Sequence, residues 1–249
     1  MLADLSLLFP YMLGAAFFAA SALYASVGHG GASAYLALMG LCGMAPAEMR
    51  PIALVLNIVV SSVALVHFAR AGHFRSGLFW PLVLASVPAA FLGGWLQSPD
   101  AVFKLILAAA LLAAAWRLVA AAPESGEITR RAGWPALLAI GGCIGFLSGL
   151  VGIGGGIFLT PLLVILRWMP PKQAAALSAA FIAANSTSGI GGFLLQGGQV
   201  PGMAWALLPC VVAGGWIGSR WGSGRAPSPA LRRSLAVVLV IAAAKFVMV

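Results

Sequence analysis

The sequence predicts an all-α membrane protein that crosses the bilayer several times and consists of two similar halves. Hydrophobic residues make up 62% of the chain and charged residues only 8%, whereas soluble domains carry about 25% charged residues. Several apolar runs exceed the ~20 residues that a helix needs to cross the hydrocarbon core. Two of these runs are interrupted by glycines, and a broken helix is tolerated in a membrane only beside protein or a water-filled cavity.

The first half begins with an apolar run over residues 10–44, which is too long for one simple crossing and contains SVGHGGA at residues 26–32. Each glycine inside a helix costs roughly 1 kcal/mol relative to alanine, so these glycines predict a break. A polar joint with Glu48 and Arg50 follows. Three membrane-spanning helices are then expected, over residues 52–69, 78–96 and 102–121.

A hydrophilic connection, PESGEITRR at residues 123–131, separates the halves. We therefore expect a first transmembrane repeat over residues 1–122, a cytoplasmic linker over 123–133 and a second transmembrane repeat over 134–249. The second repeat begins with the run 134–169, which GLVGIGGG at residues 149–156 interrupts. Three further spans are expected over residues 173–195, 203–221 and 231–249.

The two halves resemble each other at an offset of 124 residues. The aligned pairs are Gly28 with Gly152, Gly30 with Gly154, Gly31 with Gly155, and Pro46 with Pro170. Helix breaks at corresponding places in two halves indicate the binding site of a secondary transporter.

The 14 Lys and Arg residues indicate how the halves are oriented. If each broken run crossed the membrane once, the two sides would hold six and eight bases, which is no bias. If each run is a hairpin that returns to its own side, by two short crossings or by re-entry to mid-depth, the split is 11 to 3, with only Arg50, Lys104 and Lys245 on the poorer side. The positive-inside rule favours the second arrangement. The sequence therefore predicts two inverted repeats, each with a glycine-broken helical hairpin plus three transmembrane helices, and both termini outside.

The glycine breaks are suited to binding anions. A helix that begins at mid-depth presents unpaired N–H groups and a partial positive charge, and glycines let a ligand approach the backbone closely. The spans hold no clear interior acid and no deep Lys or Arg, which fits an anion held by N–H, hydroxyl and amide groups. Close helix packing is the alternative explanation for such glycines. A dinucleotide-binding reading fails because the third glycine it needs is Ile157.

The candidate substrate-binding residues lie in and beside the breaks. They are Gly28, His29, Gly30, Gly31, Ser33, Asn57, Gly152, Gly154, Gly155, Gly156, Asn185 and Ser186. His29 is the titratable side chain within a break and the candidate for proton coupling, since polar residues at membrane depth are costly and usually functional. The alternatives are a hydrogen-bonded core histidine at 29 and interhelical hydrogen bonds for the two asparagines.

Other functional classes find little support in the sequence. The net charge of +9 comes from bases scattered in short loops, so no nucleic-acid partner is expected. Cys42, Cys143 and Cys210 show no CxxC spacing and are read as packing residues. No metal or other cofactor is expected, and an enzyme is the least favoured class because no nucleophile elbow is present.

Two stretches resemble the sulfite exporter TauE/SafE family, also described as the toluene sulfonate uptake permease family. They are SVGHGGASAYLALMGL in the first half and GLVGIGGGIFLTPLLVIL in the second, each followed by a joint that contains proline. PAAFLGG at residues 88–94 and AGGWIGS at 213–219 resemble a later glycine-bearing span of the family. His29 departs from the small or apolar residue expected in such a turn.

This resemblance implies a multi-pass permease of the bacterial inner membrane, with periplasmic termini, that exports sulfur-containing anions such as sulfite or organosulfonates. The working hypothesis is a secondary transporter that operates by alternating access with possible proton coupling. An importer of a related small organic anion, a passive anion channel and a non-transporting scaffold remain as alternatives, and the oligomeric state is left open.

Overall fold

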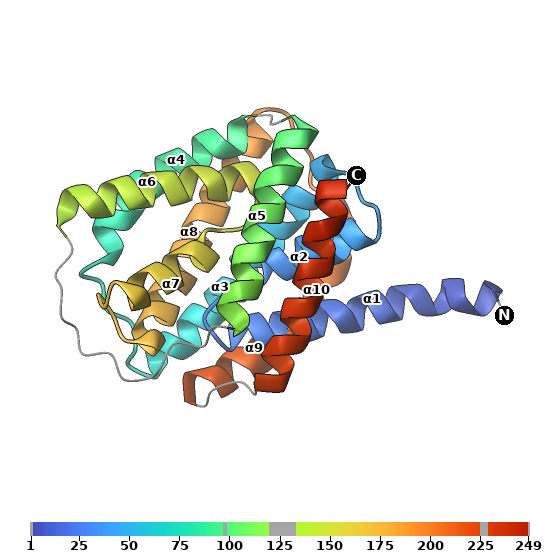
Figure 1. Ribbon diagram of the computed structural model, residues 1–249, viewed down its shortest axis with the longest axis horizontal. Coiled ribbons are helices and arrows are strands. Elements are labelled where there is room, and N and C mark those ends of the chain that lie inside the picture. The colour runs from blue at the N-terminus through green and yellow to red at the C-terminus, as the bar shows by residue number, and fades with distance from the viewer. Residues whose placement is uncertain (1, 97–98, 120–132, 225–228, 249) are drawn as a thin grey trace.

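The computed structural model describes residues 2–96, 99–119, 133–224 and 229–248, and within these ranges every regular element is an α-helix (Figure 1). The first half supplies α1 (Leu2–Ala25), α2 (Ala32–Leu41), α3 (Pro46–Arg70), α4 (Phe79–Trp95) and α5 (Asp100–Val119). The second half supplies α6 (Trp134–Val151), α7 (Gly156–Ile165), α8 (Pro171–Leu195), α9 (Met203–Gly224) and α10 (Pro229–Met248). The expected linker, except Gly133, lies outside the described residues.

The order of helix lengths recurs in the two halves. In each half a long helix is followed by one of 10 residues and then by one of 25 residues. Ten residues give a helix about 15 Å long, which is about half of the hydrocarbon core, so neither α2 nor α7 can cross a membrane alone. Among the described helices, α3, α6 and α8 are both long and apolar enough to do so.

Both expected breaks are confirmed. The first separates α1 from α2, and Gly28 and Gly31 there have φ of 77° and 96°. The second separates α6 from α7, where Gly152, Gly154 and Gly155 have φ of 84°, 79° and 83°. This left-handed region is readily open only to glycine, which explains why the chain turns at these residues.

Two helices begin earlier than expected, because each begins with a proline. The chain enters α3 at Pro46 and α8 at Pro171, whereas the apolar runs suggested residues 52 and 173. Proline favours the first helical position, since its missing N–H group needs no partner there. The early start places Arg50 inside a helix and not in a joint between helices.

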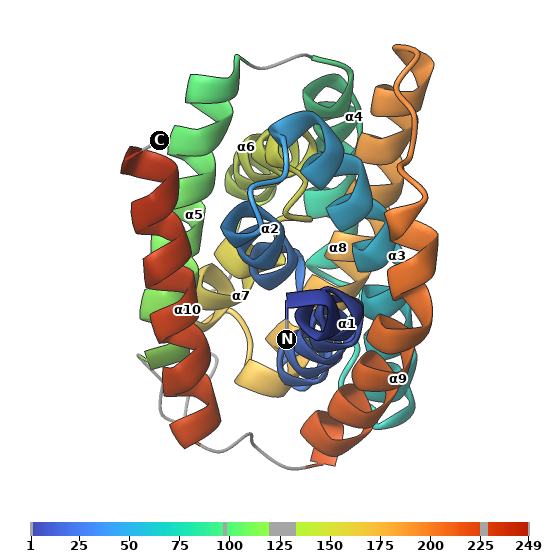
Figure 2. The ribbon, with the colours of Figure 1, turned by 90° about the vertical axis from the view of Figure 1, so that its right-hand side faces the viewer.

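The halves are interlocked and do not form two separate bodies. The first helix of each half packs against the fourth helix of the other, so α1 lies against α9 and α6 against α4. The third helices, α3 and α8, pack against each other, and the fifth helices, α5 and α10, lie side by side at one edge (Figures 1 and 2). Every major contact thus recurs with the roles of the halves exchanged, as in a two-fold arrangement.

Small residues allow the crossed helices to approach closely. A Cβ atom at Gly141, Gly145 or Gly149 of α6 would lie 2.0–2.3 Å from a carbonyl oxygen of α4. The same holds for α9, where Gly214 and Gly218 meet carbonyls of α1 and Gly222 meets that of Ser26 just after α1, at 1.9–2.3 Å. Close packing, the alternative explanation for glycine in this chain, therefore applies to these helical glycines, whereas the glycines of the breaks turn the chain.

Candidate functional site

The two breaks meet at Asn57, which lies near the middle of α3 and is fully buried. Its Oδ1 accepts a hydrogen bond of 3.1 Å from the backbone N–H of Ala32, at the start of α2. Its Nδ2 donates a 3.1 Å hydrogen bond to the carbonyl of Ile153, inside the second break. One side chain from the first half therefore ties together two loops that are more than 100 residues apart in sequence.

Glycines beside Asn57 make this bridge possible. A Cβ atom at Gly30 would lie 2.2 Å from the Asn57 Oδ1, and one at Gly154 would lie 2.7 Å from the Nδ2. Gly28 and Gly152 allow a second close contact. Gly28 faces Ala175 of α8, and Gly152 faces Arg50 of α3. Each break thus packs against the start of the third helix of the other half.

His29 forms a second link between the halves. The residue is 5% exposed, with Nδ1 of its ring at 3.0 Å from the Val27 carbonyl and Nε2 at 3.0 Å from the Gly156 carbonyl. The Thr160 hydroxyl lies 3.2 Å from Nε2 and donates its own hydrogen to Ser178 over 2.7 Å. Carbonyl oxygens only accept and a neutral imidazole has one N–H group, so protonation of both ring nitrogens would let the ring donate on both sides.

Thr160 and Ser178 were missed by the sequence analysis. Thr160 is the only hydroxyl residue of α7 and lies one helical turn after Gly156, which is a weak signal that could have been noticed. Ser33 was expected in the binding site, but its hydroxyl donates to the Tyr24 hydroxyl over 2.8 Å. In this conformation Ser33 therefore joins α2 to α1.

On α6 and α8, several buried polar atoms have no hydrogen-bond partner among the described residues. They are Nδ2 and Oδ1 of Asn185, Oγ of Ser186 and Oγ of Ser148, and all three residues are 0% exposed. A Cβ atom at Gly154 would lie 3.1 Å from the Ser186 Oγ, and one at Gly155 would lie 3.5 Å from the Ser148 Cβ. Burying a polar atom without a partner costs about 1–3 kcal/mol, so this cluster has unused capacity to bind a polar ligand.

The two asparagines do not play equivalent parts. When α3 and α8 are aligned from their first residues, Asn57 corresponds to Ile182, and Asn185 corresponds to Val60. Asn57 makes hydrogen bonds within the protein, as the interhelical alternative supposed, whereas Asn185 has none. The pseudo-symmetry of the backbone therefore does not extend to the polar side chains.

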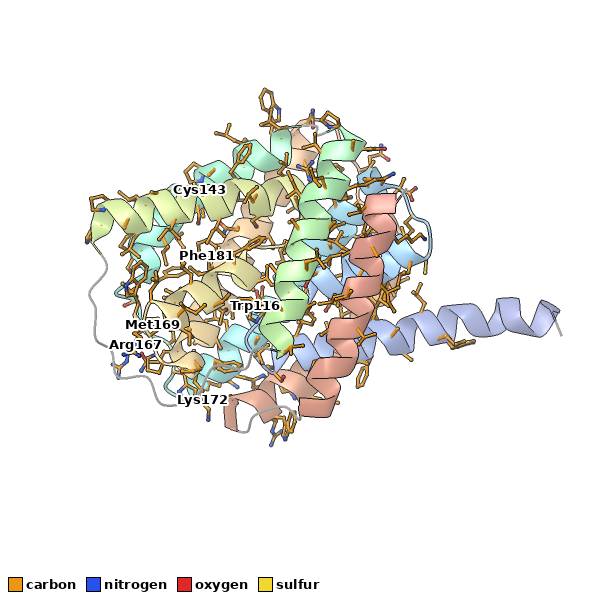
Figure 3. The ribbon with its side chains drawn as sticks, viewed as in Figure 1. Trp116, Cys143, Arg167, Met169, Lys172 and Phe181 are labelled. Atoms are coloured by element: carbon orange, nitrogen blue, oxygen red, sulfur yellow. The ribbon has the colours of Figure 1, made fainter. Side chains whose placement is uncertain are left out.

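Arg50, which the sequence placed in the joint before a span, is buried in the first turns of α3. This residue is only 7% exposed, and its guanidinium donates to the carbonyls of Gly93, Gly94 and Leu96 at the end of α4. The sequence pattern Glu48–Arg50 suggested a joint, but the early start of α3 carries the arginine inward. Arg167 and Lys172 instead lie at an edge of the molecule, around the turn between α7 and α8 (Figure 3).

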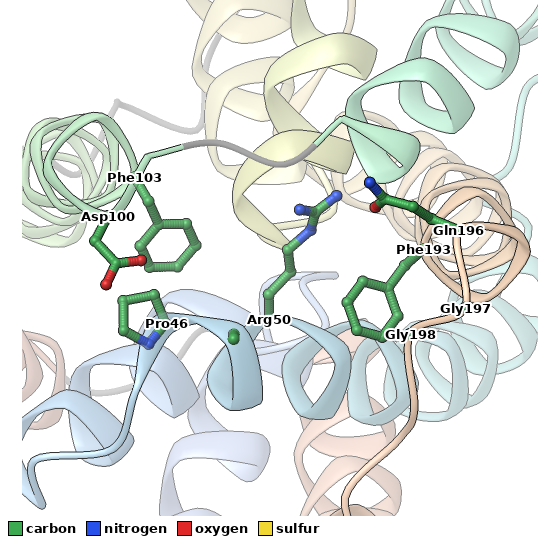
Figure 4. Close-up of a pocket in the computed structure, with 9 residues that line it drawn as sticks. Pro46, Arg50, Asp100, Phe103, Phe193, Gln196, Gly197 and Gly198 are labelled. Carbon is green, nitrogen blue, oxygen red and sulfur yellow. The ribbon is translucent and has the colours of Figure 1, made fainter.

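A cavity of about 330 Å³ adjoins Arg50, between the start of α3, the start of α5 and the end of α8 (Figure 4). Its walls include the rings of Phe103 and Phe193, and the Arg50 guanidinium lies 5.7 Å from the centre of the Phe193 ring. In the described part of the chain, no three His, Cys, Asp or Glu side chains gather closely enough to hold a metal ion.

Comparisons with known proteins agree on the family. The family model described as sulfite exporter TauE/SafE matches residues 12–246. A probable membrane transporter protein of Sinorhizobium fredii, y4hK, is 34% identical over 238 residues, which cover 94% of this chain and 96% of the relative. No solved structure matches the chain.

Shorter matches involve two further proteins. The probable membrane transporter YunE of Bacillus subtilis is 35% identical over 34% of this chain and 30% of the relative. The probable membrane transporter YfcA of Escherichia coli is 36% identical over 41% of this chain and 37% of the relative. Given the nearly full-length family match, the chain belongs to the sulfite exporter TauE/SafE family of membrane transporters.

Proposed function

We propose that this protein is a secondary transporter that exports sulfur-containing anions, such as sulfite or organosulfonates, across the bacterial inner membrane by alternating access. Family membership supports transport in general, and the family's name suggests the anion. The observation that carries the proposal is the set of buried polar atoms on Ser148, Asn185 and Ser186 that have no partner among the described residues. Ser148 and Ser186 lie beside the second glycine break. Buried polar groups normally have partners, so these groups favour a polar ligand that comes and goes.

The local charge favours an anion over a cation. Both α2 and α7 begin at a glycine N-cap in the interior, and the start of a helix carries a partial positive charge of roughly half an elementary charge. Asn57 takes up the Ala32 N–H group at α2. At α7 the N–H groups of Phe158 and Leu159 bond to the Gly155 carbonyl. Those of Gly156 and Ile157 have no acceptor among the described residues, which leaves these two groups available to an oxyanion.

The backbone arrangement supports inverted repeats. In Figure 1, α1 runs inward from one side of the molecule and α6 runs inward from the opposite side, and each ends at its glycine break. Two broken hairpins that approach from opposite faces, with a shared site between them, form the arrangement in which alternating access is understood for other transporters. We propose that small movements of α2 and α7 open the site to one side at a time.

His29 is proposed as the proton-coupling residue. Its ring bridges Val27 in one hairpin and Gly156 in the other, so a change in its protonation changes a contact between the halves. The Tyr24 ring packs edge-on against the imidazole, with the two ring centres 6.3 Å apart. Proton movement through His29 would therefore be coupled directly to the geometry of the two breaks.

The test is uptake of radiolabelled sulfite into proteoliposomes, with and without an imposed pH gradient. We expect saturable flux that responds to the gradient, and in His29→Ala we expect flux that no longer responds to it. His73→Ala is the matched control, since His73 lies in the turn after α3 and contacts Ser223. Saturable flux that ignores the gradient in the unmodified protein would exclude proton coupling.

The same assay separates the competing functions. A passive channel would give flux that follows only the anion's electrochemical gradient, without saturation or counterflow. An importer would show the opposite preference when the proton gradient is reversed. If neither sulfite nor an organosulfonate moves, the substrate assignment is wrong, although the family membership is unaffected.

A further inference from the structure

The cavity beside Arg50 lies apart from the glycine breaks and is unexplained by the site described above. Arg50 and Asn57 are separated by two turns of α3, which is about 10 Å along the helix. The cavity is bounded by the ends of three helices and is lined by Pro46, Arg50, Asp100, Phe103, Phe193 and Gln196 (Figure 4). Its volume of about 330 Å³ is in the range of small-molecule sites.

Among the described residues, no carboxylate pairs with the buried cation of Arg50. Within the described residues its recorded hydrogen bonds all go to backbone carbonyls of α4, although Asp100 lines the same cavity. The end of a helix carries roughly half a negative charge, so the α4 carbonyls offset only part of the guanidinium's charge. Because a buried charge is costly unless it is paired, the remaining positive charge favours an anion here.

Capping of α4 does not use all of the hydrogen-bond donors of Arg50. A guanidinium has five N–H groups, and the bonds to Gly93, Gly94 and Leu96 account for three of them. The Nε atom is buried and has no hydrogen-bond partner. Lys245 provides a comparison, since it caps α2 through the carbonyls of Gly40 and Leu41 but is not among the residues that line this cavity.

The side chain of Arg50 also contacts the second break. A Cβ atom at Gly152 would lie 3.1 Å from the Arg50 carbonyl and 3.2 Å from its Cγ, so the stem of the arginine touches the loop that leads to the polar cluster. Arg50 therefore connects the cavity to the second break, although no residue of that break lines the cavity.

We propose that this cavity is a second anion-binding site, in which the Arg50 guanidinium holds a small oxyanion at the mouth of the transport path. The role of this site in transport rests on the proposed function, whereas anion binding at Arg50 does not depend on it. The rings of Phe103 and Phe193 on the walls predict that an anion with a short apolar tail, such as ethanesulfonate, binds more tightly than sulfite. Asp100, on the α5 side, weakens anion binding.

The first experiment measures occupancy without transport. Gln196 is exposed and lines the cavity, so Gln196→Cys is made in a chain whose three native cysteines are replaced by alanine. We measure how fast this cysteine reacts with an anionic and with a cationic thiol reagent. Sulfite or ethanesulfonate should slow both reactions, and Arg50→Gln should lower the anionic-to-cationic rate ratio about tenfold, as expected for the loss of one nearby positive charge.

Two variants distinguish binding from structure. Arg50→Lys keeps the charge and can still cap α4, but it lacks the planar set of N–H groups, so we expect the rate ratio to persist while protection by anions weakens. Asp100→Asn should strengthen protection. Protection is measured first with Arg50 present, so it does not depend on whether Arg50→Gln folds.

Flux through the same chains separates the two proposals. Protection without flux of either anion would support the Arg50 site and contradict the proposed transport function. Flux without protection would overturn the Arg50 site and leave Arg50 as a cap of α4. An unchanged rate ratio in a folded Arg50→Gln protein would also overturn it.

Discussion

Asn57 and Asn185 offer a controlled comparison, because both are fully buried asparagines on corresponding 25-residue helices. We consider Asn57→Ala and Asn185→Ala. The two substitutions remove the same atoms, so the loss of packing is similar. They differ in what is left behind, since Asn57 has partners on both breaks and Asn185 has none.

The expected magnitudes follow from this difference. Asn57→Ala leaves the Ala32 N–H and the Ile153 carbonyl without partners, at about 1–3 kcal/mol each. Asn185→Ala removes two unpartnered atoms and leaves no other polar group without a hydrogen-bond partner. The free energy of unfolding should therefore fall by roughly 2–6 kcal/mol more for Asn57→Ala. A change of 1 kcal/mol shifts the Tm of a chain of this size by about 2–4 °C, so the two Tm values should differ by at least about 4 °C.

Ligand binding should show the reverse order. A hydrogen bond to a charged group contributes about 1.5–3 kcal/mol, so Asn185→Ala should weaken sulfite binding by roughly 10- to 150-fold. A ligand at 100 times its Kd stabilises the folded state by about 2.7 kcal/mol, which is a rise in Tm of about 5–11 °C. This rise should largely disappear in Asn185→Ala.

The assay is thermal unfolding of purified protein in detergent, with and without sulfite, followed by tryptophan fluorescence. Asn185→Ala should unfold near the temperature of the unmodified protein and show little response to sulfite. If instead it loses as much stability as Asn57→Ala and keeps the full sulfite response, Asn185 is a structural residue, and the second break is not the binding site.

Two further predictions address the breaks and the orientation. Gly154→Ala should reduce flux and lower the free energy of unfolding by roughly 1–2 kcal/mol or more, because the backbone there is left-handed and the new Cβ would lie 2.7 Å from both Asn57 and Ile182. The helical control Gly142→Ala should be tolerated, since its Cβ would meet only Ala85 at 3.9 Å. Equal flux in both variants would contradict a role for the break. Cys42 is exposed in the turn after α2, so a membrane-impermeant maleimide should label it from outside intact cells, and labelling only after lysis would reverse the predicted orientation.

The breaks were predictable because glycine has a local signature. A run of glycines in an apolar segment cannot form a stable helix, whatever the rest of the chain does, and the duplication repeated that signal. The importance of Asn57 could also be anticipated, since an amide at membrane depth needs a partner. The hydrogen-bond partners of Asn57 could not be anticipated, because they depend on how α3 packs against both loops.

The burial of Arg50 and the contacts of His29 depend on tertiary structure. Arg50 stands two residues after an acid and beside prolines, which locally suggests a joint; only the start of α3 at Pro46 and the end of α4 above it carry the guanidinium inward. The link from His29 to Thr160 spans 131 residues, and no local pattern encodes such a distance. Sequence reasoning therefore identified His29 and Asn57 but missed their long-range partners, such as Thr160.

The contrast between the breaks suggests a division of labour within the proposed transporter. In the first break His29, Ser33 and the N–H of Ala32 have partners within the protein, and the Tyr35 hydroxyl beside Gly31 is the group without one. In the second half Ser148, Ser186 and Asn185 have no partner among the described residues. A ligand gains most where it satisfies groups that the empty protein leaves unpaired. The second half would then bind the anion. The first half would respond to that binding through the hydrogen bonds of His29 and Asn57 to the second break and to α7. Substitutions at Asn185 should accordingly raise the KM, and those at His29 should change the response to the proton gradient.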